Sequence, residues 1–194
     1  MHGFDHILRV LRLAELLASK EGADLEIVRA AVLLHDARGG QATDEGRSEH
    51  QHLSASFAEE ILRKNDWPKD RILAVQHCIR SHRFRGDEQA QSLEAKVVFD
   101  ADKLDVIGAF GVARTIAFDV EVGQPIFAEP SEHFLETGQK EEGEAHSSYH
   151  EFLFKLGKIK DRLYTSSARE LAEGRHKFLV KFFEQMLAES RGER

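Results

Sequence analysis

The stretch EGADLEIVRAAVLLHDARGG, residues 21–40, contains the pattern that decides the fold. Its apolar residues recur at helical spacing, which predicts a buried helix. Asp24 is placed as the N-cap of this helix. We expect the helix to end near the two glycines that close the stretch, because residues without a Cβ tolerate positive φ. The dipeptide His35-Asp36 therefore stands near the carboxyl end of an apolar helix.

Helical periodicity continues through most of the chain, without the alternation of apolar and polar residues that is typical of strands. The fold class is therefore predicted to be all-α. Besides a first helix around residues 7–17, the expected helices cover residues 48–64, 68–81, 92–118, 148–163 and 166–189.

The segment 92–118 is apolar almost all round, which predicts a central buried helix. Residues 119–147 contain two of the three prolines and an acidic stretch, so this segment is predicted to be a loop or lid. We expect one domain over residues 1–194. Its metal-site core is residues 1–118, followed by the loop and by C-terminal helices over residues 148–191.

Composition excludes several classes of protein. A net charge of -7 argues against duplex nucleic acid as a partner, because such binding depends on basic residues that neutralise phosphates. Cys78 is the only cysteine, so no intramolecular disulfide forms. The sequence contains neither a signal peptide nor an apolar run of membrane length, which predicts a cytoplasmic protein without a membrane partner. An apolar stripe in residues 178–187 predicts core packing or the seam of a homodimer.

The position of Asp36 is unfavourable unless a cation lies nearby. A carboxylate at the carboxyl end of a helix faces the negative end of the helix dipole, and burial disfavours its charge further. A metal ion would remove both objections. The alternative reading is that His35 is a hydrogen-bonded core histidine and that Asp36 caps a neighbouring group.

Acidic residues in the predicted central helix also need an explanation, because buried charges are normally paired or coordinate metal. Asp102 and Asp105 share a helix face, whereas Asp100 points elsewhere. One of the two is predicted to be a ligand and the other to support it. Lys103 offers a competing explanation as an internal ion-pair partner.

His6 lies on the buried side of the first predicted helix, where it is either a structural histidine or a further ligand. Two imidazoles and two carboxylates would form a mixed set suited to borderline-to-hard divalent ions. The sequence therefore predicts one divalent metal per chain, with Mn²⁺ preferred and Fe²⁺, Co²⁺, Ni²⁺ or Mg²⁺ as alternatives; a second metal is left open. Without thiolate ligands, structural zinc is disfavoured.

The order H…HD…D, formed by His6, His35-Asp36 and Asp102, resembles the HD superfamily of metal-dependent phosphohydrolases. The stretches DHILRVLRLA, SLEAKVVFDADKLDVIGAFGVAR and KLGKIKDRLYTSSARELAEGRHKF resemble a bacterial and archaeal subgroup that includes nucleoside triphosphate pyrophosphohydrolases. The resemblance implies an HD-domain helical bundle with additional C-terminal helices. It also implies that these four residues ligate one metal and that the two carboxylates belong to the catalytic machinery.

The same resemblance places His50 and His82 where binuclear members have further histidines, so both are predicted to be catalytic, holding a second ion or contacting phosphate. His52 and His77 are expected to be solvated or core residues, with the alternative that one of them takes the role of its neighbour. No glutamate follows the HD dipeptide at the short spacing seen in some HD nucleotidases, so the general base is unassigned.

Three basic residues match the resemblance and are predicted to bind the phosphates of a substrate: Arg114, Lys155 and Arg175. Their alternative role is solvation of the surface. The predicted function is hydrolysis of a phosphate ester or phosphoanhydride, in a nucleotide or another small phosphorylated metabolite, by a metal-activated water. The alternatives are a non-catalytic HD module that binds a nucleotide or signalling ligand, and a helical interaction protein with a structural metal.

Overall fold

The structure, a computed structural model, describes residues 3–38, 44–83 and 88–193, with the backbone alone for residues 44–49. This described part of the chain is helical and contains no strand, so the predicted all-α class is confirmed. Within it, no helix combines the length and the apolar character needed to cross a membrane.

The chain divides into two compact units. The N-terminal unit comprises His2–Leu104 and Leu163–Ala168, and the C-terminal unit comprises Asp105–Arg162 and Arg169–Arg194. Each unit is described by itself below. The single domain expected over residues 1–194 stays a prediction.

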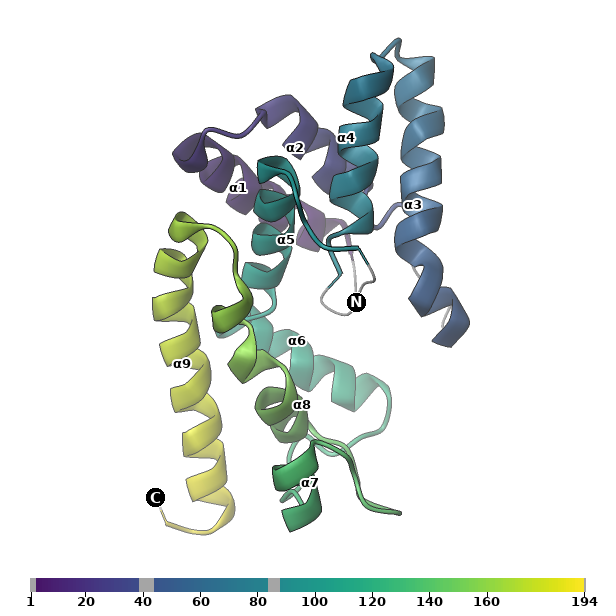
Figure 1. The fold of residues 1–194 in the computed structure, drawn as a ribbon. Helices are drawn as coiled ribbons and strands as arrows, with labels where there is room; N and C mark the ends of the chain where they lie inside the picture. The colour runs from purple at the N-terminus through teal and green to yellow at the C-terminus, as the bar shows by residue number, and fades with distance from the viewer. Residues whose placement is uncertain (1–2, 39–43, 84–87, 194) are drawn as a thin grey trace. The chain divides into compact units, whose positions relative to one another are not determined.

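The N-terminal unit packs its helices in pairs, with α1 against α2, α3 against α4, and α2 against α4 (Figure 1). The helices are α1 (Phe4–Glu21), α2 (Leu25–Leu34), α3 (Asp44–Lys64), α4 (Lys69–Arg80) and α5 (Leu93–Asp105). The last of these is buried from Val97 to Asp105, as expected for the central helix.

Asp24 fixes the start of α2 and its attachment to α4. Its carboxylate accepts hydrogen bonds from the backbone N–H groups of Glu26 and Ile27, as predicted for an N-cap. The same carboxylate pairs with Arg71 of α4 at 2.9 Å. The helix ends at Leu34, earlier than predicted, and the glycines expected to end it, residues 39 and 40, lie outside the described residues.

The prediction of one continuous helix over residues 92–118 is wrong, because two helices occupy this segment. Helix α5 ends at Asp105, Ile107 is extended, and α6 (Gly108–Glu121) begins at Gly108 with φ of 75°. A Cβ at Gly108 would lie 3.1 Å from the Cβ of Arg175. Glycine is therefore required here both by the positive φ and by the close approach of α9 (Ser166–Ser190).

Aromatic residues form the core of the C-terminal unit. The ring of Phe152 stacks on Phe183 with 4.6 Å between centroids. Leu179 and Phe183 of the predicted stripe are buried, whereas Phe178 is 49% exposed. The helix predicted over residues 148–163 is shorter: α8 (Ser148–Phe154) is followed by two 3₁₀ turns, η1 (Leu156–Lys158) and η2 (Lys160–Arg162).

The predicted loop over residues 119–147 contains a helix of its own, α7 (Glu132–Thr137). Glu144 organises the segment, because its carboxylate accepts hydrogen bonds from Ser131 and from the backbone N–H of Glu141. The backbone hydrogen bond from Ser131 is the main cause that lowers the pKa of Glu144 to about 2. Closure of this segment over a bound ligand stays a prediction.

Asp100 on α5 anchors the segment that precedes α9. Its fully buried carboxylate accepts hydrogen bonds from the backbone N–H of Tyr164 at 2.9 Å and from both the N–H and the hydroxyl of Thr165 at 2.7 Å. The prediction that Asp100 points away from Asp102 agrees with these contacts. This acidic residue is satisfied by the protein itself.

We expect Asp100→Ala to lower the free energy of unfolding by about 2–4 kcal/mol, because it leaves three donors at Tyr164 and Thr165 without their acceptor. Denaturant unfolding of metal-free protein measures the change. Asp161→Ala, at an exposed carboxylate, is the control and should change stability by less than ~0.5 kcal/mol. Equal effects of the two substitutions would contradict this role of Asp100.

Candidate metal centre

Side chains from the ends of several helices converge in the N-terminal unit. His6 comes from the first turn of α1, His35 caps the end of α2 and Asp36 follows it, His50 lies on α3, His82 follows α4, and Asp102 lies in the last turn of α5. Every metal ligand predicted from the sequence, and both additional histidines, therefore belong to one compact unit.

These side chains form two groups that share one histidine. The first group is His6, His35 and Asp102, and the second is His35, Asp36 and His82. Within each group the potential ligand atoms all lie within 4.8 Å of one another. The two groups are thus continuous, and together they contain all four predicted ligands.

Asp36 lies among three imidazoles. Its carboxylate oxygens are 3.5 Å from Nε2 of His35, 3.6 Å from Nε2 of His50 and 3.8 Å from Nε2 of His82. The ring centroids of His35 and His82 are 5.0 Å apart. The predicted second-site histidines, His50 and His82, are therefore brought to the same carboxylate as His35.

The protein backbone fixes the orientation of two of these imidazoles. Nδ1 of His35 lies 2.7 Å from the carbonyl oxygen of Val32, and Nδ1 of His82 lies 2.6 Å from that of Ile79. A carbonyl oxygen only accepts hydrogen bonds, so each Nδ1 carries the proton. In the neutral ring, Nε2 then presents its lone pair to the cluster, which is the usual arrangement of a metal-binding histidine.

Burial favours the neutral form of His82. Its pKa is lowered to about 3, mainly by burial and further by the charge of His35. Asp102, by contrast, is held in its charged form. Burial alone would raise its pKa, but the charge of Lys103 and a hydrogen bond with His6 keep that pKa well below the usual range. The cluster thus combines a neutral imidazole with an ionised carboxylate.

The donor set fits a divalent cation. Nε2 of His35 is buried and has no hydrogen-bond partner among the described residues. Folded proteins rarely leave a buried polar atom without such a partner. His35 is 1% exposed and Asp102 is 7% exposed. A cation bound by imidazole nitrogens and carboxylate oxygens would satisfy both the lone pair and the buried charge.

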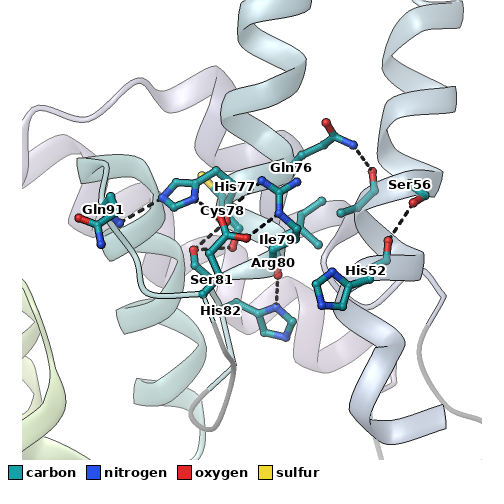
Figure 2. Close-up of polar contacts among 12 residues, drawn as sticks. His52, Ser56, Gln76, His77, Cys78, Ile79, Arg80, Ser81, His82 and Gln91 are labelled. Carbon is teal, nitrogen blue, oxygen red and sulfur yellow. Dashed lines mark hydrogen bonds and ion pairs between the residues drawn. The ribbon is translucent and has the colours of Figure 1, made fainter. Parts of the chain in front are cut away.

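The end of α4 determines where His82 lies (Figure 2). Ser81 ends the helix: its backbone N–H and its hydroxyl both donate to the carbonyl of His77, at 3.0 and 2.7 Å. His82 then turns back, so that its Nδ1 reaches the carbonyl of Ile79. The sequence signals for this placement are weak, because a serine and a histidine end many helices.

His77 holds the chain after α4 and does not join the cluster. Its Nδ1 contacts Glu88 at 2.5 Å, and its Nε2 accepts a hydrogen bond from the backbone N–H of Gln91 at 3.1 Å. Glu88 also binds Arg80 at 2.6 Å. His52 is exposed on α3. Neither histidine therefore competes with His50 or His82 for a place in the site.

Sequence reasoning missed the contacts that support the site. Ser54, fully buried on α3, accepts a hydrogen bond from the backbone N–H of Arg38 at 3.1 Å and so fixes the turn after Asp36. Gln51, next to His50, accepts a hydrogen bond from Arg83 at 3.2 Å. A serine or glutamine in a helix carries no signal of such a partner, because the contact depends on how the helices pack.

The predicted phosphate-binding residues all belong to the C-terminal unit: Arg114, Lys155 and Arg175. Lys155 pairs with Glu151 at 2.8 Å. Arg175 is partly buried, and burial lowers its pKa while the charge of Asp105 opposes that shift. Asp105 itself is buried and lies in this unit. The roles of these residues in binding phosphate stay predictions.

Comparison with known proteins agrees with the geometry. The model of the HD domain family matches residues 3–107. The uncharacterized protein YpgQ of Bacillus subtilis is 36% identical over 189 residues, which cover 95% of this chain and 82% of YpgQ. Ribonuclease Y of Chloroflexus aurantiacus is 32% identical over 118 residues, or 60% of this chain and 20% of that enzyme.

Solved structures show the same fold over nearly the whole chain. The crystal structure of B. subtilis YpgQ in complex with ADP has a TM-score of 0.76 at 34% identity, and the match covers 100% of this chain and 92% of that one. An HD-superfamily hydrolase from Bacillus thuringiensis has a TM-score of 0.72 at 29% identity, with 98% and 87% covered.

We expect metal-stripped protein to bind about one divalent transition-metal ion per chain, because the cluster offers both nitrogen and oxygen ligands. Calorimetric titration with Mn²⁺ and elemental analysis measure this. His35→Ala removes the imidazole that both groups share and should weaken binding by more than about 10-fold.

His133→Ala, at an exposed histidine of α7, is the matched control and should leave Mn²⁺ binding unchanged. Wild-type protein that binds no divalent ion at micromolar concentration would contradict the proposed ligand set, and so would a His35→Ala variant that binds like the wild type.

Proposed function

The chain belongs to the HD domain family, and on that premise we propose that it is a divalent-metal-dependent phosphohydrolase acting on a nucleotide. Family membership supports a hydrolase and a divalent metal, and the geometry of the N-terminal unit supports the identity of the ligands. In this proposal His6, His35, Asp36 and Asp102 hold the ion.

One observation carries the proposal. Nε2 of His35, oriented by the carbonyl of Val32 and lacking a hydrogen-bond partner among the described residues, faces the carboxylates of Asp36 and Asp102. A buried cluster of this kind is unfavourable without a cation. A site that served only the fold would more simply contain apolar residues.

The residues of the cluster have distinct tasks in the proposed reaction. When bound, a divalent ion supplies Lewis acidity to a phosphoryl oxygen and acidifies a water molecule. Asp36 and Asp102 provide the negative charge that retains the ion, and His35 presents a fixed lone pair. His82, neutral and held by Ile79, can accept a hydrogen bond from a water molecule through its Nε2.

His50 completes the proposed site on the side of α3. Its Nε2 lies near Asp36, and its side chain is 18% exposed, more than those of His35 and His82. An imidazole that is reached by solvent can contact a substrate phosphate or a second ion. We retain both assignments for His50 within the proposal, and the metal stoichiometry distinguishes them.

A nucleotide is the proposed substrate because the related structure of YpgQ is a complex with ADP. The match with that structure covers 100% of this chain and 92% of the other. Hydrolysis of a phosphate bond in a nucleotide requires charge neutralisation along the phosphates. Arg114, Lys155 and Arg175 are proposed for that task.

The experiment that tests this function is a substrate screen. Metal-stripped protein is reloaded with Mn²⁺, Co²⁺, Ni²⁺ or Mg²⁺ and incubated with nucleoside mono-, di- and triphosphates and with sugar phosphates. Released phosphate and pyrophosphate are measured separately. Metal-dependent turnover of a nucleotide supports the proposal, whereas binding of nucleotide without turnover would favour a non-catalytic HD module.

Asp36→Ala is expected to lower kcat/KM by more than about 100-fold, since even the loss of an outer-shell partner of a metal ligand costs 10–100-fold. The metal-free fold should remain, because removing this carboxylate from the end of α2 relieves a helix-dipole repulsion of roughly 0.3–1 kcal/mol. Mn²⁺ should raise the melting temperature of the wild type only.

The control is Asp70→Ala, at an exposed carboxylate in the first turn of α4, which should retain wild-type kcat/KM. An Asp36→Ala variant with wild-type turnover would argue against Asp36 as a ligand. Unfolding of the metal-free variant would instead assign Asp36 to a buried hydrogen-bond network.

A further inference from the structure

We infer that Lys103 is a positioning residue of the metal site: its ammonium group is the counter-ion of Asp102 until a divalent ion binds, and it therefore opposes binding of that ion. The inference rests on the proposed metal site. It assigns a second role to a residue that the sequence presents only as an internal ion-pair partner.

The ion pair between these residues is short and nearly excluded from solvent. Nζ of Lys103 donates to Oδ2 of Asp102 at 2.5 Å, and the two side chains are 11% and 10% exposed. The other carboxylate oxygen, Oδ1, lies 3.4 Å from Nε2 of His6. The carboxylate of Asp102 therefore stands between the ammonium group and the imidazoles.

Helix geometry does not produce this contact by itself. Consecutive residues on a helix point about 100° apart, so neighbours in sequence do not normally face each other. The long side chain of Lys103 must turn back to reach Asp102, and it lies over the ring of Phe99 at 5.3 Å. Asp100, another buried carboxylate of α5, is already bound by Tyr164 and Thr165.

The charge of Lys103 and the binding of a divalent ion at Asp102 are coupled, and electrostatics gives the sign of this coupling. A buried carboxylate without a positive partner is strongly disfavoured, so Lys103 stabilises the metal-free site. A divalent ion at Asp102 brings two further positive charges close to the ammonium group, and like charges repel. Coupling between two sites is reciprocal, so the ion must also weaken the contribution of Lys103 to stability.

Other roles for Lys103 predict a different sign. If the side chain only packs against Phe99, its removal changes stability equally with and without metal. If it only orients the carboxylate for the ion, its removal weakens metal binding. Only the role of counter-ion predicts that removal of the Lys103 charge destabilises the metal-free protein and at the same time tightens metal binding.

The test uses Lys103→Met, which keeps an unbranched side chain of similar length and removes its charge. Thermal unfolding is recorded for metal-free and Mn²⁺-saturated protein, and Mn²⁺ affinity is measured by titration. We expect a lower melting temperature than wild type without metal, a smaller difference when Mn²⁺ is bound, and a dissociation constant for Mn²⁺ at least ~5-fold lower.

Lys96→Met is the matched control, because Lys96 lies two turns earlier on α5, roughly 10 Å along the helix axis, where its charge is largely screened. This variant should leave both readouts unchanged. Equal loss of stability in Lys103→Met with and without Mn²⁺, or weaker Mn²⁺ binding, would overturn the inference.

Failure of wild-type protein to bind Mn²⁺ would instead remove the proposed metal site, and the inference with it. If Lys103→Met does not fold without metal, the double variant Asp102→Asn/Lys103→Met provides the answer. It has no buried carboxylate to balance and should recover metal-free stability. A double variant that stays as unstable as the single one would overturn the role of counter-ion.

Discussion

The arrangement of the N-terminal unit depends on the cost of placing carboxylates among buried imidazoles. Asp36 and Asp102 lie at the carboxyl ends of α2 and α5, where the helix dipole and low solvent access both disfavour negative charge. Lys103 offsets part of this cost at Asp102. A divalent ion would offset the remainder, and His35 lies within 4.8 Å of the potential ligand atoms of both carboxylates, in the two groups that share this histidine.

Much of this was predictable from the sequence because it follows from local patterns. Asp24 begins α2 as an N-cap, and the apolar face of that helix brings His35 to its buried end. The ordered motif then identified His6 and Asp102, and the structure places both with His35 in one group. The all-α class followed from helical periodicity over most of the chain.

The features that the sequence did not predict depend on contacts between distant segments. The break between α5 and α6 is imposed where Gly108 approaches Arg175, and an apolar run gives no sign of it. The orientation of His35 and His82 is set by backbone carbonyls, and that of the turn after Asp36 by Ser54. The sequence is equally uninformative about the proposed contact of Arg114, Lys155 and Arg175 with phosphate, because that contact depends on tertiary structure.

The central claim is that this cluster holds a divalent ion, and a crystal of Mn²⁺-loaded protein tests it most directly. An anomalous difference map calculated from data collected near the manganese absorption edge locates the ion without reference to activity. The account predicts a strong peak bounded by Nε2 of His6 and His35 and by the carboxylates of Asp36 and Asp102, at roughly 2 Å from each ligand atom. A peak that lies elsewhere, or no peak in protein saturated with Mn²⁺, would contradict it.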